Sequence, residues 1–254
     1  MRLKDKVCIV TGGASGLGKT FSLALAEQGA KVTVCANSSD PKSVVEEIKS
    51  KGGEAIGVKV DVREVASTEE MAAKTKEAFG RIDVLIANAG LYGQLRPQPF
   101  EAIDPDEWDM VMKVNLKGPY LCSRAVLPAM REQKSGNIII VSSVFWVVGR
   151  LPCMHYAVTK AGEIGMMRQM AAQLGPENIR VNAFMPGGTW DEGTEKFLSG
   201  LPPETGDVLV NQMQLINRKL MPEDLVGGLL FLASDESNMM TGQALPVAGG
   251  ICFY

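Results

Sequence analysis

Residues 7–18 run Val7-Cys8-Ile9-Val10-Thr11-Gly12-Gly13-Ala14-Ser15-Gly16-Leu17-Gly18. A short unbroken apolar run between a charged residue and a glycine is typical of a strand buried on both faces of a parallel sheet. Apolar residues then recur at helical spacing, so the glycines connect a strand to a helix. Glycines at such a turn let backbone amides approach a pyrophosphate at the helix N-terminus. The first gap between them is wider than in the usual dinucleotide fingerprint, and a glycine-rich turn without a ligand is the alternative.

The rest of the chain alternates strand patterns with helix patterns. We expect strands over 7–10, 31–36, 55–61, 84–87, 137–141 and 181–185, and helices over 21–28, 42–51, 68–79, 106–114, 120–132 and 155–174. Such alternation predicts a parallel sheet with helices on both faces. The fold class is therefore α/β, with a Rossmann-type doubly wound sheet in three αβα layers, and residues 1–254 form a single dinucleotide-binding and catalytic domain.

Residues 187–220 break this rhythm, because Gly, Pro and Thr are scattered among apolar positions without a clean period. We expect a loop with a short helix there. Ligands of doubly wound sheets bind beyond the carboxyl ends of the strands, and this segment leaves such an end. A substrate loop that covers the site is therefore favoured over an ordinary surface excursion.

Composition narrows the function. The 254 residues carry a net charge of −3, which offers no field to gather nucleic acid or an anionic membrane. The apolar run after the first residues is too short for a signal peptide or a membrane span, so we expect a cytoplasmic protein. The 5 cysteines are scattered without CxxC spacing, which predicts buried thiols and no metal site.

Further motifs follow in order along the chain. Asp61-Val62 comes at the end of the third expected strand, Asn88-Ala89-Gly90 at the end of the fourth, and Tyr156-Ala157-Val158-Thr159-Lys160 opens a later helix. With these elements the chain resembles the short-chain dehydrogenase/reductase family in its one-domain form. The resemblance extends from Lys6 to Gly250, and the TGxxxGxG, NAG, N, S, YxxxK and PG elements appear in family order.

The resemblance implies where a nicotinamide nucleotide binds. Gly12, Gly16 and Gly18 would face its pyrophosphate, Asp61 and Val62 its adenine, and Asn88 and Gly90 its adenosine side, while Pro186-Gly187 would flank the nicotinamide. The full implied set is Gly12, Ser15, Gly16, Leu17, Gly18, Asn37, Ser38, Asp61, Val62, Asn88, Ala89, Gly90, Tyr156, Lys160, Pro186, Gly187 and Thr189. The chain departs from the family at Ala87, where a second Asn is usual, and at Ala248, where an Asp is usual.

The choice between NADP and NAD depends on the end of the second expected strand. An acid there would bind both ribose hydroxyls of NAD and repel a 2′-phosphate. The chain has Ala36-Asn37-Ser38-Ser39, and no acid before Asp40. Asn37 and Ser38 can donate hydrogen bonds to a phosphate, although the basic residues of NADP-preferring relatives are missing. NADP is favoured, and NAD is the alternative.

Tyr156 and Lys160 carry the expected chemistry. Hydride transfer to a carbonyl needs an acid at the oxygen, and the reverse reaction needs a base there. Lowering a phenol pKa by ~3 units corresponds to ~4 kcal/mol, which one ammonium at ~4 Å supplies at an effective dielectric of ~20. Residues four apart share a helix face, so Lys160 can act on Tyr156. A lone YxxxK pattern also occurs as an exposed helical pair.

Two further side chains complete the expected catalytic set. Ser143 can hold the substrate oxygen while Tyr156 donates its proton. The family spacing to the tyrosine favours Ser143 over Ser142, which would point to the opposite side of the extended backbone. By resemblance, Asn115 breaks a helix and helps hold a water beside the lysine. We expect His155 on the pocket wall or the surface, because neighbours on a helix point about 100° apart.

Bulky apolar residues follow the motif residues directly, and we expect a pocket lined by Tyr92, Phe145, Trp146, Cys153 and Trp190. The small-molecule substrate would then be a hydrophobic or aromatic secondary alcohol or ketone. The alternative is that these residues pack in the hydrophobic core and do not line a pocket. A catalytically idle dinucleotide-binding sensor or scaffold is the alternative for the function.

The resemblance also implies a homotetramer or homodimer. The helices over 120–132 and 155–174 would pair across a dimer interface, and Ala244 to Ala248 would support a tetramer. The apolar end Ile251-Cys252-Phe253-Tyr254 is expected to dock on a neighbouring subunit.

Overall fold

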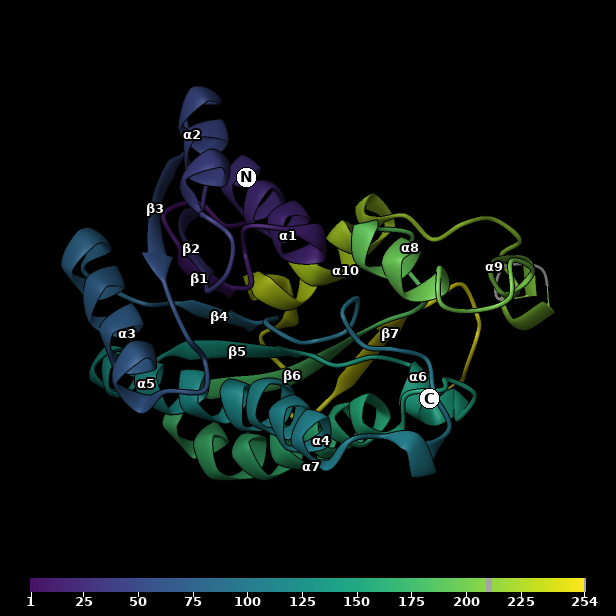
Figure 1. Cartoon of the computed structure of the whole chain (residues 1–254). Coiled ribbons are helices and arrows are strands. Elements are labelled where there is room, and N and C mark those ends of the chain that lie inside the picture. Colours follow the sequence, from purple (N-terminus) through teal and green to yellow (C-terminus); the bar gives the residue numbers. More distant parts are fainter. Residues whose placement is uncertain (209–211, 254) are drawn as a thin grey trace.

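A computed structural model describes residues 1–208 and 212–253. Within them the chain forms a parallel sheet with strand order β3-β2-β1-β4-β5-β6-β7 (Figure 1). The order reverses between β1 and β4, which leaves a crevice beyond the carboxyl ends of these strands. The predicted fold class, a doubly wound α/β domain, is confirmed.

The strands are short and mostly buried, as unbroken Val, Ile and Ala runs require. Neighbours pair in parallel register, with Val10 opposite both Val34 and Ile86. The bounds are β1 Val7–Thr11, β2 Lys31–Ala36, β3 Glu54–Lys59, β4 Val84–Ala87, β5 Gly136–Val141, β6 Ile179–Pro186 and β7 Ala244–Val247. Because β3 and β5 end two residues before Asp61 and Ser143, these side chains lie just past the sheet rather than in it.

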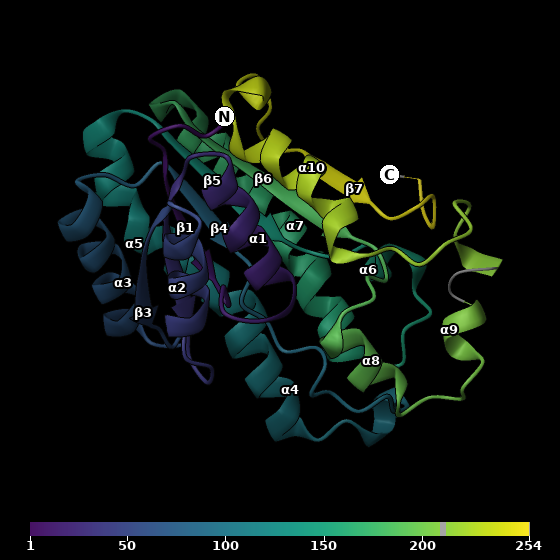
Figure 2. The ribbon, with the colours of Figure 1, turned by 90° about the horizontal axis from the view of Figure 1, so that it is seen from above.

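Helices cover both faces of the sheet. One layer contains α1 Gly16–Glu27, α2 Lys42–Ser50 and α10 Pro222–Ala233, and the other contains α3 Val65–Phe79, α5 Gly118–Gln133 and α7 Met154–Leu174 (Figures 1 and 2). Each layer buries its own apolar cluster. Phe21 and Leu229 pack on the first face, and Met71 and Met167 pack on the second.

The helix expected over 106–114 has a different form. It is α4, Pro105–Val111, followed by a π-helix η2, Met112–Lys117, which continues into α5. π-helical turns are rare and frequently occur at functional sites. Here the wide turn contains Asn115, which is fully buried.

Short elements connect the remainder. They are η1 Phe100–Ala102, α6 Phe145–Val148, η3 Gly175–Glu177, α8 Glu192–Leu198, α9 Thr205–Val208 and η5 Asp235–Ser237. The segment 187–220 was expected to hold one short helix, and its described part contains both α8 and α9. Residues 209–211 of this segment lie outside the described residues.

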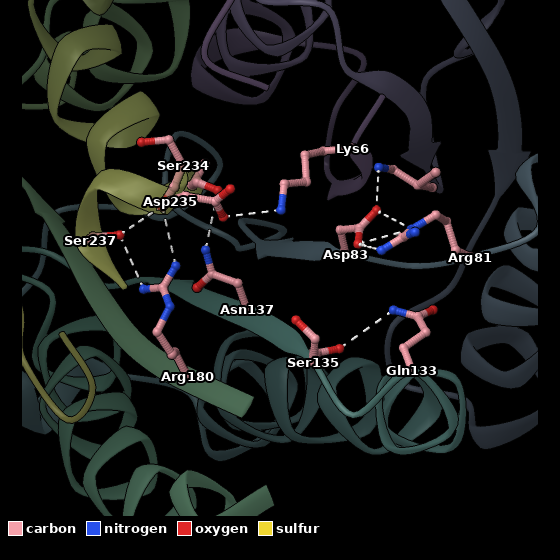
Figure 3. A network of polar contacts seen from close by, with 12 residues as sticks. Lys6, Arg81, Asp83, Gln133, Ser135, Asn137, Arg180, Ser234, Asp235 and Ser237 are labelled. Atoms are coloured by element: carbon pink, nitrogen blue, oxygen red, sulfur yellow. Dashed lines mark hydrogen bonds and ion pairs between the residues drawn. The ribbon is translucent and has the colours of Figure 1, made fainter. Parts of the chain in front are cut away.

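The amino-terminal edge of the sheet is held by a separate polar network (Figure 3). Asp83, just before β4, accepts a hydrogen bond from the Val7 amide at 2.8 Å and pairs with the Arg81 guanidinium. On the other side, Asn137 donates to the Leu232 carbonyl oxygen in the last turn of α10, and Arg180 donates to the Ser234 carbonyl oxygen just after it. These polar contacts hold the strands and α10 together, and they lie at the edge opposite the glycine turn.

Gly18 offers a sharp test of the turn. A Cβ on Gly18 would lie 1.9 Å from the carbonyl oxygen of Gly12. Gly18→Ala should therefore lower the free energy of unfolding by about 1–3 kcal/mol or more, measured by denaturant unfolding, because the backbone must move apart.

Gly227→Ala is the matched control. Nothing lies within 4 Å of a Cβ at Gly227 in α10, so this change should raise stability by up to about 1 kcal/mol through helix propensity. Equal effects at the two positions would contradict the steric account.

Candidate active site

A cavity of about 650 Å³ lies along the carboxyl ends of β1, β2, β4, β5 and β6. Every residue predicted to bind the nicotinamide nucleotide lines it. These are Gly12, Ser15, Gly16, Leu17, Gly18, Asn37, Ser38, Asp61, Val62, Asn88, Ala89, Gly90, Tyr156, Lys160, Pro186, Gly187 and Thr189. The fold therefore brings residues from widely separated parts of the sequence onto one wall.

The glycine turn is shaped for an anion. Gly12 and Gly16 have φ of 63° and 48°, which side chains rarely adopt, and Gly18 has no room for a Cβ. Ser15 precedes α1 without capping it through its side chain, and no acid stands in the first turn. The amides at this helix N-terminus can therefore bind a pyrophosphate.

Beyond β2 and β3 the cavity is lined by Asn37, Ser38 and Asp61. Arg63 pairs with Asp61 through two nitrogens, at 2.8 Å from Nε to Oδ1 and 2.5 Å from Nη2 to Oδ2. This guanidinium lowers the pKa of Asp61 to about 2. Arg63 was not among the expected site residues, although an arginine two positions after a strand-end aspartate is a readable signal. It places a cation at this end of the cavity.

Thr11 holds the Asn88-Ala89-Gly90 turn. Its Oγ1 accepts hydrogen bonds from the amides of Asn88 and Ala89, both at 3.0 Å. In return, Asn88 Nδ2 donates to the Thr11 carbonyl oxygen at 3.0 Å. The turns after β1 and β4 are thus fixed to each other across the crevice.

Asn115 fastens the next residue of that turn. The Leu91 amide donates to Asn115 Oδ1 at 2.7 Å, and Asn115 Nδ2 donates back to the Leu91 carbonyl at 3.1 Å. Both groups of the side-chain amide are therefore used on the backbone. Asn115 itself does not line the cavity. If it helps to hold a water beside Lys160, it must do so with its main-chain groups.

Tyr156 and Lys160 sit side by side near the start of α7. Tyr156 is 9% exposed and Lys160 is 5% exposed, and the Lys160 Nζ lies 5.6 Å from the centre of the phenol ring. Burial raises the pKa of Tyr156 well above its usual value, and the neighbouring Tyr92 and Glu163 add to this, while a hydrogen bond with Ser143 opposes it. The phenol therefore stands protonated, as a general acid requires.

The two serines after β5 diverge. Ser143 faces Tyr156 and lowers the pKa of its phenol, and the Ser143 hydroxyl accepts a hydrogen bond from the Phe145 amide at 3.2 Å. The Ser142 hydroxyl donates instead to the carbonyl oxygen of Lys160 at 2.8 Å. Ser143 is thus placed to hold a substrate oxygen, and Ser142 anchors the backbone of α7.

An aromatic cluster stands over the phenol. The Tyr92 ring lies 5.1 Å from Tyr156 and stacks on Phe197 of α8 at 4.9 Å. Phe145 lines the cavity beside them. Tyr92 and Phe145, both expected in the substrate pocket, thus lie on its wall, and Phe197 backs it from the 187–220 segment.

The other three expected pocket residues do not line the cavity. Trp146, second in α6, packs against the cluster that also contains Met167. Trp190 turns away toward Lys219, whose Nζ lies 4.5 Å from its ring. Cys153 is fully buried among the residues behind Tyr156. A strand-end position alone did not reveal which way each side chain turns.

His155 was expected on the pocket wall or the surface, and that expectation is wrong. Its side chain is 0% exposed and lies outside the cavity lining. Nε2 is 2.8 Å from Oε1 of Glu107 on α4. The pair fastens α7 to α4. Sequence spacing did not show it, because the two residues lie on helices that meet only in the folded chain.

Cys8, Cys35, Cys122 and Cys153 are buried free thiols, as predicted, whereas Cys252 near the chain end is only half-buried. In residues 1–208 and 212–253, no three His, Cys, Asp or Glu side chains group as metal ligands. Across the same residues, no helix is both long and apolar enough to cross a membrane.

A doubly wound sheet, a glycine turn shaped for an anion and a buried Ser-Tyr-Lys group on one cavity are typical of nicotinamide-dependent oxidoreductases. A family model described as short chain dehydrogenase matches residues 6–199. The chain belongs to the short-chain dehydrogenase/reductase family, whose members bind NAD(P), and the predicted resemblance is confirmed.

Individual relatives cover nearly the whole chain. A 3-oxoacyl-[acyl-carrier-protein] reductase, FabG, of Thermotoga maritima is 38% identical over 99% of this chain and 99% of its own. The (2S)-[(R)-hydroxy(phenyl)methyl]succinyl-CoA dehydrogenase subunit BbsD of Thauera aromatica is 37% identical over 98% of each. A 7α-hydroxysteroid dehydrogenase solved with NADH and 7-oxo glycochenodeoxycholic acid superposes with a TM-score of 0.90, at 30% identity, over 98% of this chain and 95% of that one.

Thr11 gives the second test. Thr11→Val should lower the free energy of unfolding by about 1–3 kcal/mol and weaken nucleotide binding, because the Ala89 amide loses its acceptor and the Asn88 amide keeps only the Ile86 carbonyl. Denaturant unfolding and a fluorescence titration with the nucleotide measure the two effects.

Thr11→Ser keeps the hydroxyl and is the control, for which near-normal stability and affinity are expected. Equal stability and nucleotide affinity in the Thr11→Val and Thr11→Ser variants would show that the Thr11 hydrogen bonds do not position the turn.

Proposed function

We propose that the protein interconverts a secondary alcohol and a ketone by hydride transfer, with Tyr156 as the general acid and base. One observation carries the proposal: the buried phenol of Tyr156 shares the cavity with Ser143 and with Lys160, whose Nζ lies 5.6 Å from the centre of the phenol ring. A role in binding alone would not require this set. The catalytically idle sensor is therefore the weaker candidate.

Each side chain has a distinct part. A nicotinamide nucleotide, when bound, supplies or accepts the hydride. Ser143 holds the substrate oxygen by a hydrogen bond. In reduction Tyr156 passes its phenolic proton to that oxygen, and in oxidation the ionised phenol removes the proton from the alcohol. The Lys160 ammonium stabilises the ionised phenol, and Asn115 keeps the turn at Leu91 in place beside the reacting group.

We propose a hydrophobic or aromatic substrate. Tyr92 and Phe145 form an apolar wall next to the phenol, and Phe197 supports it from behind. The name of the Thauera aromatica relative contains a hydroxy(phenyl)methyl group, and the steroid dehydrogenase was solved with a 7-oxo bile acid conjugate. Both names place an alcohol or a ketone on a bulky carbon skeleton, which supports this substrate class.

We propose NADP as the favoured nucleotide. No acid stands over Ala36 to Ser39, and Asn37 and Ser38 line the cavity where a 2′-phosphate would approach. Arg63 adds a cation at the same end, although it is paired with Asp61. NAD remains the alternative, since the related steroid dehydrogenase was solved with NADH.

We further propose a cytoplasmic homotetramer or homodimer. Exposed apolar side chains gather on the helices expected to pair, with Tyr120 on α5 and Met154 and Val158 on α7. Buried free thiols suit a reducing compartment. Docking of the apolar chain end stays a prediction. Phe253 is 86% exposed, in keeping with it, and Tyr254 lies outside the described residues.

Tyr156→Phe tests the mechanism. We expect turnover to fall by about 10²- to 10⁴-fold with nucleotide affinity nearly unchanged, because only the proton donor is removed. The absorbance of the reduced nicotinamide, followed with both nucleotides over a panel of ketones and alcohols, measures the rate.

Tyr120→Phe removes an exposed hydroxyl on α5 and is the matched control, with unchanged turnover expected. A near-normal rate for Tyr156→Phe would refute the mechanism. Tight nucleotide binding by the wild type without turnover of any substrate would favour the sensor.

Ala36→Asp tests the nucleotide preference. A carboxylate at the end of β2 should repel the 2′-phosphate and shift the ratio of kcat/KM for NADP over NAD by about tenfold or more toward NAD, about 1.4 kcal/mol. Ala36→Asn has nearly the same size without the charge and should shift the ratio much less. An unchanged NADP preference in the Ala36→Asp variant would refute the proposal that the missing acid at the end of β2 favours NADP.

A further inference from the structure

Glu163 lies on the catalytic face of α7, although no motif includes it. Tyr156, Lys160 and Glu163 follow one another at i, i+4 and i+7, so their side chains lie in one row along the helix. The Glu163 side chain is 0% exposed. The row therefore runs from the reacting phenol to a carboxyl group in the protein interior.

Glu163 makes one strong contact in this interior. The Lys160 Nζ donates to Glu163 Oε1 at 2.9 Å and to the Val141 carbonyl oxygen at 2.8 Å. Among the described residues, the second oxygen, Oε2, has no hydrogen bond within normal geometry. The Lys160 ammonium is thus held between the end of β5 and Glu163.

Stability does not account for a carboxylate at this place. Ile164 and Met167, its neighbours on α7, are buried in the apolar cluster of the same layer. Buried ion pairs are often no more stabilising than apolar residues of similar volume. Burial raises the pKa of Glu163 to about 7, against the lowering effect of Lys160 and Ser142. Burial therefore favours the neutral form of Glu163, while the neighbouring Lys160 favours the ionised form.

We propose that Glu163 is a positioning residue for the reaction: it holds the Lys160 ammonium against Val141 and offsets the positive charge that Lys160 presents to the Tyr156 phenol. This inference rests on the proposed role of Tyr156. When Glu163 is ionised, the pair is net neutral and the phenol keeps its proton. When Glu163 is neutral, the whole lysine charge acts on the phenol and favours its ionisation.

Few other charges bear on this row. Tyr92 and Cys153 face the phenol, and each raises the pKa of Tyr156. From α4, Glu107 is paired with His155. The other charged residues of the elements packed on α7 are exposed or engaged elsewhere. Asp106 and Asp109 of α4 and Lys113 and Lys117 of η2 are exposed, Glu177 of η3 pairs with Arg131, and Arg180 of β6 donates to the Ser237 hydroxyl.

The experiment compares the pH dependence of alcohol oxidation in four proteins, the wild type and three variants of Glu163. Glu163→Gln removes the charge and keeps the size. The rising limb of kcat/KM, which follows ionisation of Tyr156, should move by about one pH unit to lower pH, because a charge about two helical turns from the phenol no longer opposes its ionisation. Glu163→Leu should move it in the same direction, and Glu163→Asp, which keeps the charge, should leave it near the wild-type position.

Glu107→Gln is the matched control. It removes the partner of another basic side chain of α7, and the limb should stay in place. Thermal unfolding of each variant separates a change in stability from a change in the limb.

A second readout does not need turnover. With the oxidised nucleotide bound, the ultraviolet absorbance of tyrosinate is titrated, and the Tyr156→Phe signal is subtracted to isolate Tyr156. Its titration should also move by about one unit in Glu163→Gln. Absence of turnover would count against the proposed function, while this titration still tests Glu163.

Three outcomes would overturn the inference. The first is that the kcat/KM limb and the Tyr156 titration coincide in the wild type and Glu163→Gln. The second is that the limb moves equally in Glu163→Asp and Glu163→Gln, and the third is that both neutral variants fail to fold, which would assign Glu163 a structural role.

Discussion

The contact between the first turn of α1 and the turn after β1 is the constraint on which the site depends. Because a Cβ on Gly18 would lie 1.9 Å from the Gly12 carbonyl, the two backbones pack without any side chain between them. This contact aims the N-terminus of α1 across the ends of the strands. Thr11, in the same turn, then fixes Asn88 and Ala89 after β4, so one backbone contact determines the geometry on both sides of the crevice.

A chain of contacts continues from these turns to the phenol of Tyr156. The Asn88 turn ends at Leu91, which Asn115 holds from η2, and Tyr92 then lies over the phenol of Tyr156. A π-helical turn widens the backbone where Asn115 must reach inward. The aromatic wall is thus an extension of the nucleotide-binding turns, and the substrate end and the nucleotide end cannot move independently. Stacking on Phe197 adds the 187–220 segment to the same unit.

Much of this was predictable from the sequence, for a physical reason. Parallel strands bring their carboxyl ends to one edge, so the residues that follow β1, β4 and β5 must gather once the alternation is recognised. Side-chain direction was less accessible. Trp146 and Trp190, like Phe145, are bulky aromatic residues that follow a strand. Trp146 nevertheless packs against the apolar core, and Trp190 lies under Lys219. That choice is made by tertiary packing, which no local pattern encodes.

Buried charge was the other feature that local patterns hid. His155 and Glu107 are far apart in sequence and meet only because α4 packs against α7. Glu163 differs from that pair, because its spacing from Lys160 can be read in the sequence and only its burial cannot. A carboxylate at that position in water would do little to a phenol two turns away, because solvent screens it. Enclosed in the α7 layer, it is screened much less, so the surrounding apolar packing is itself part of the electrostatics of Tyr156.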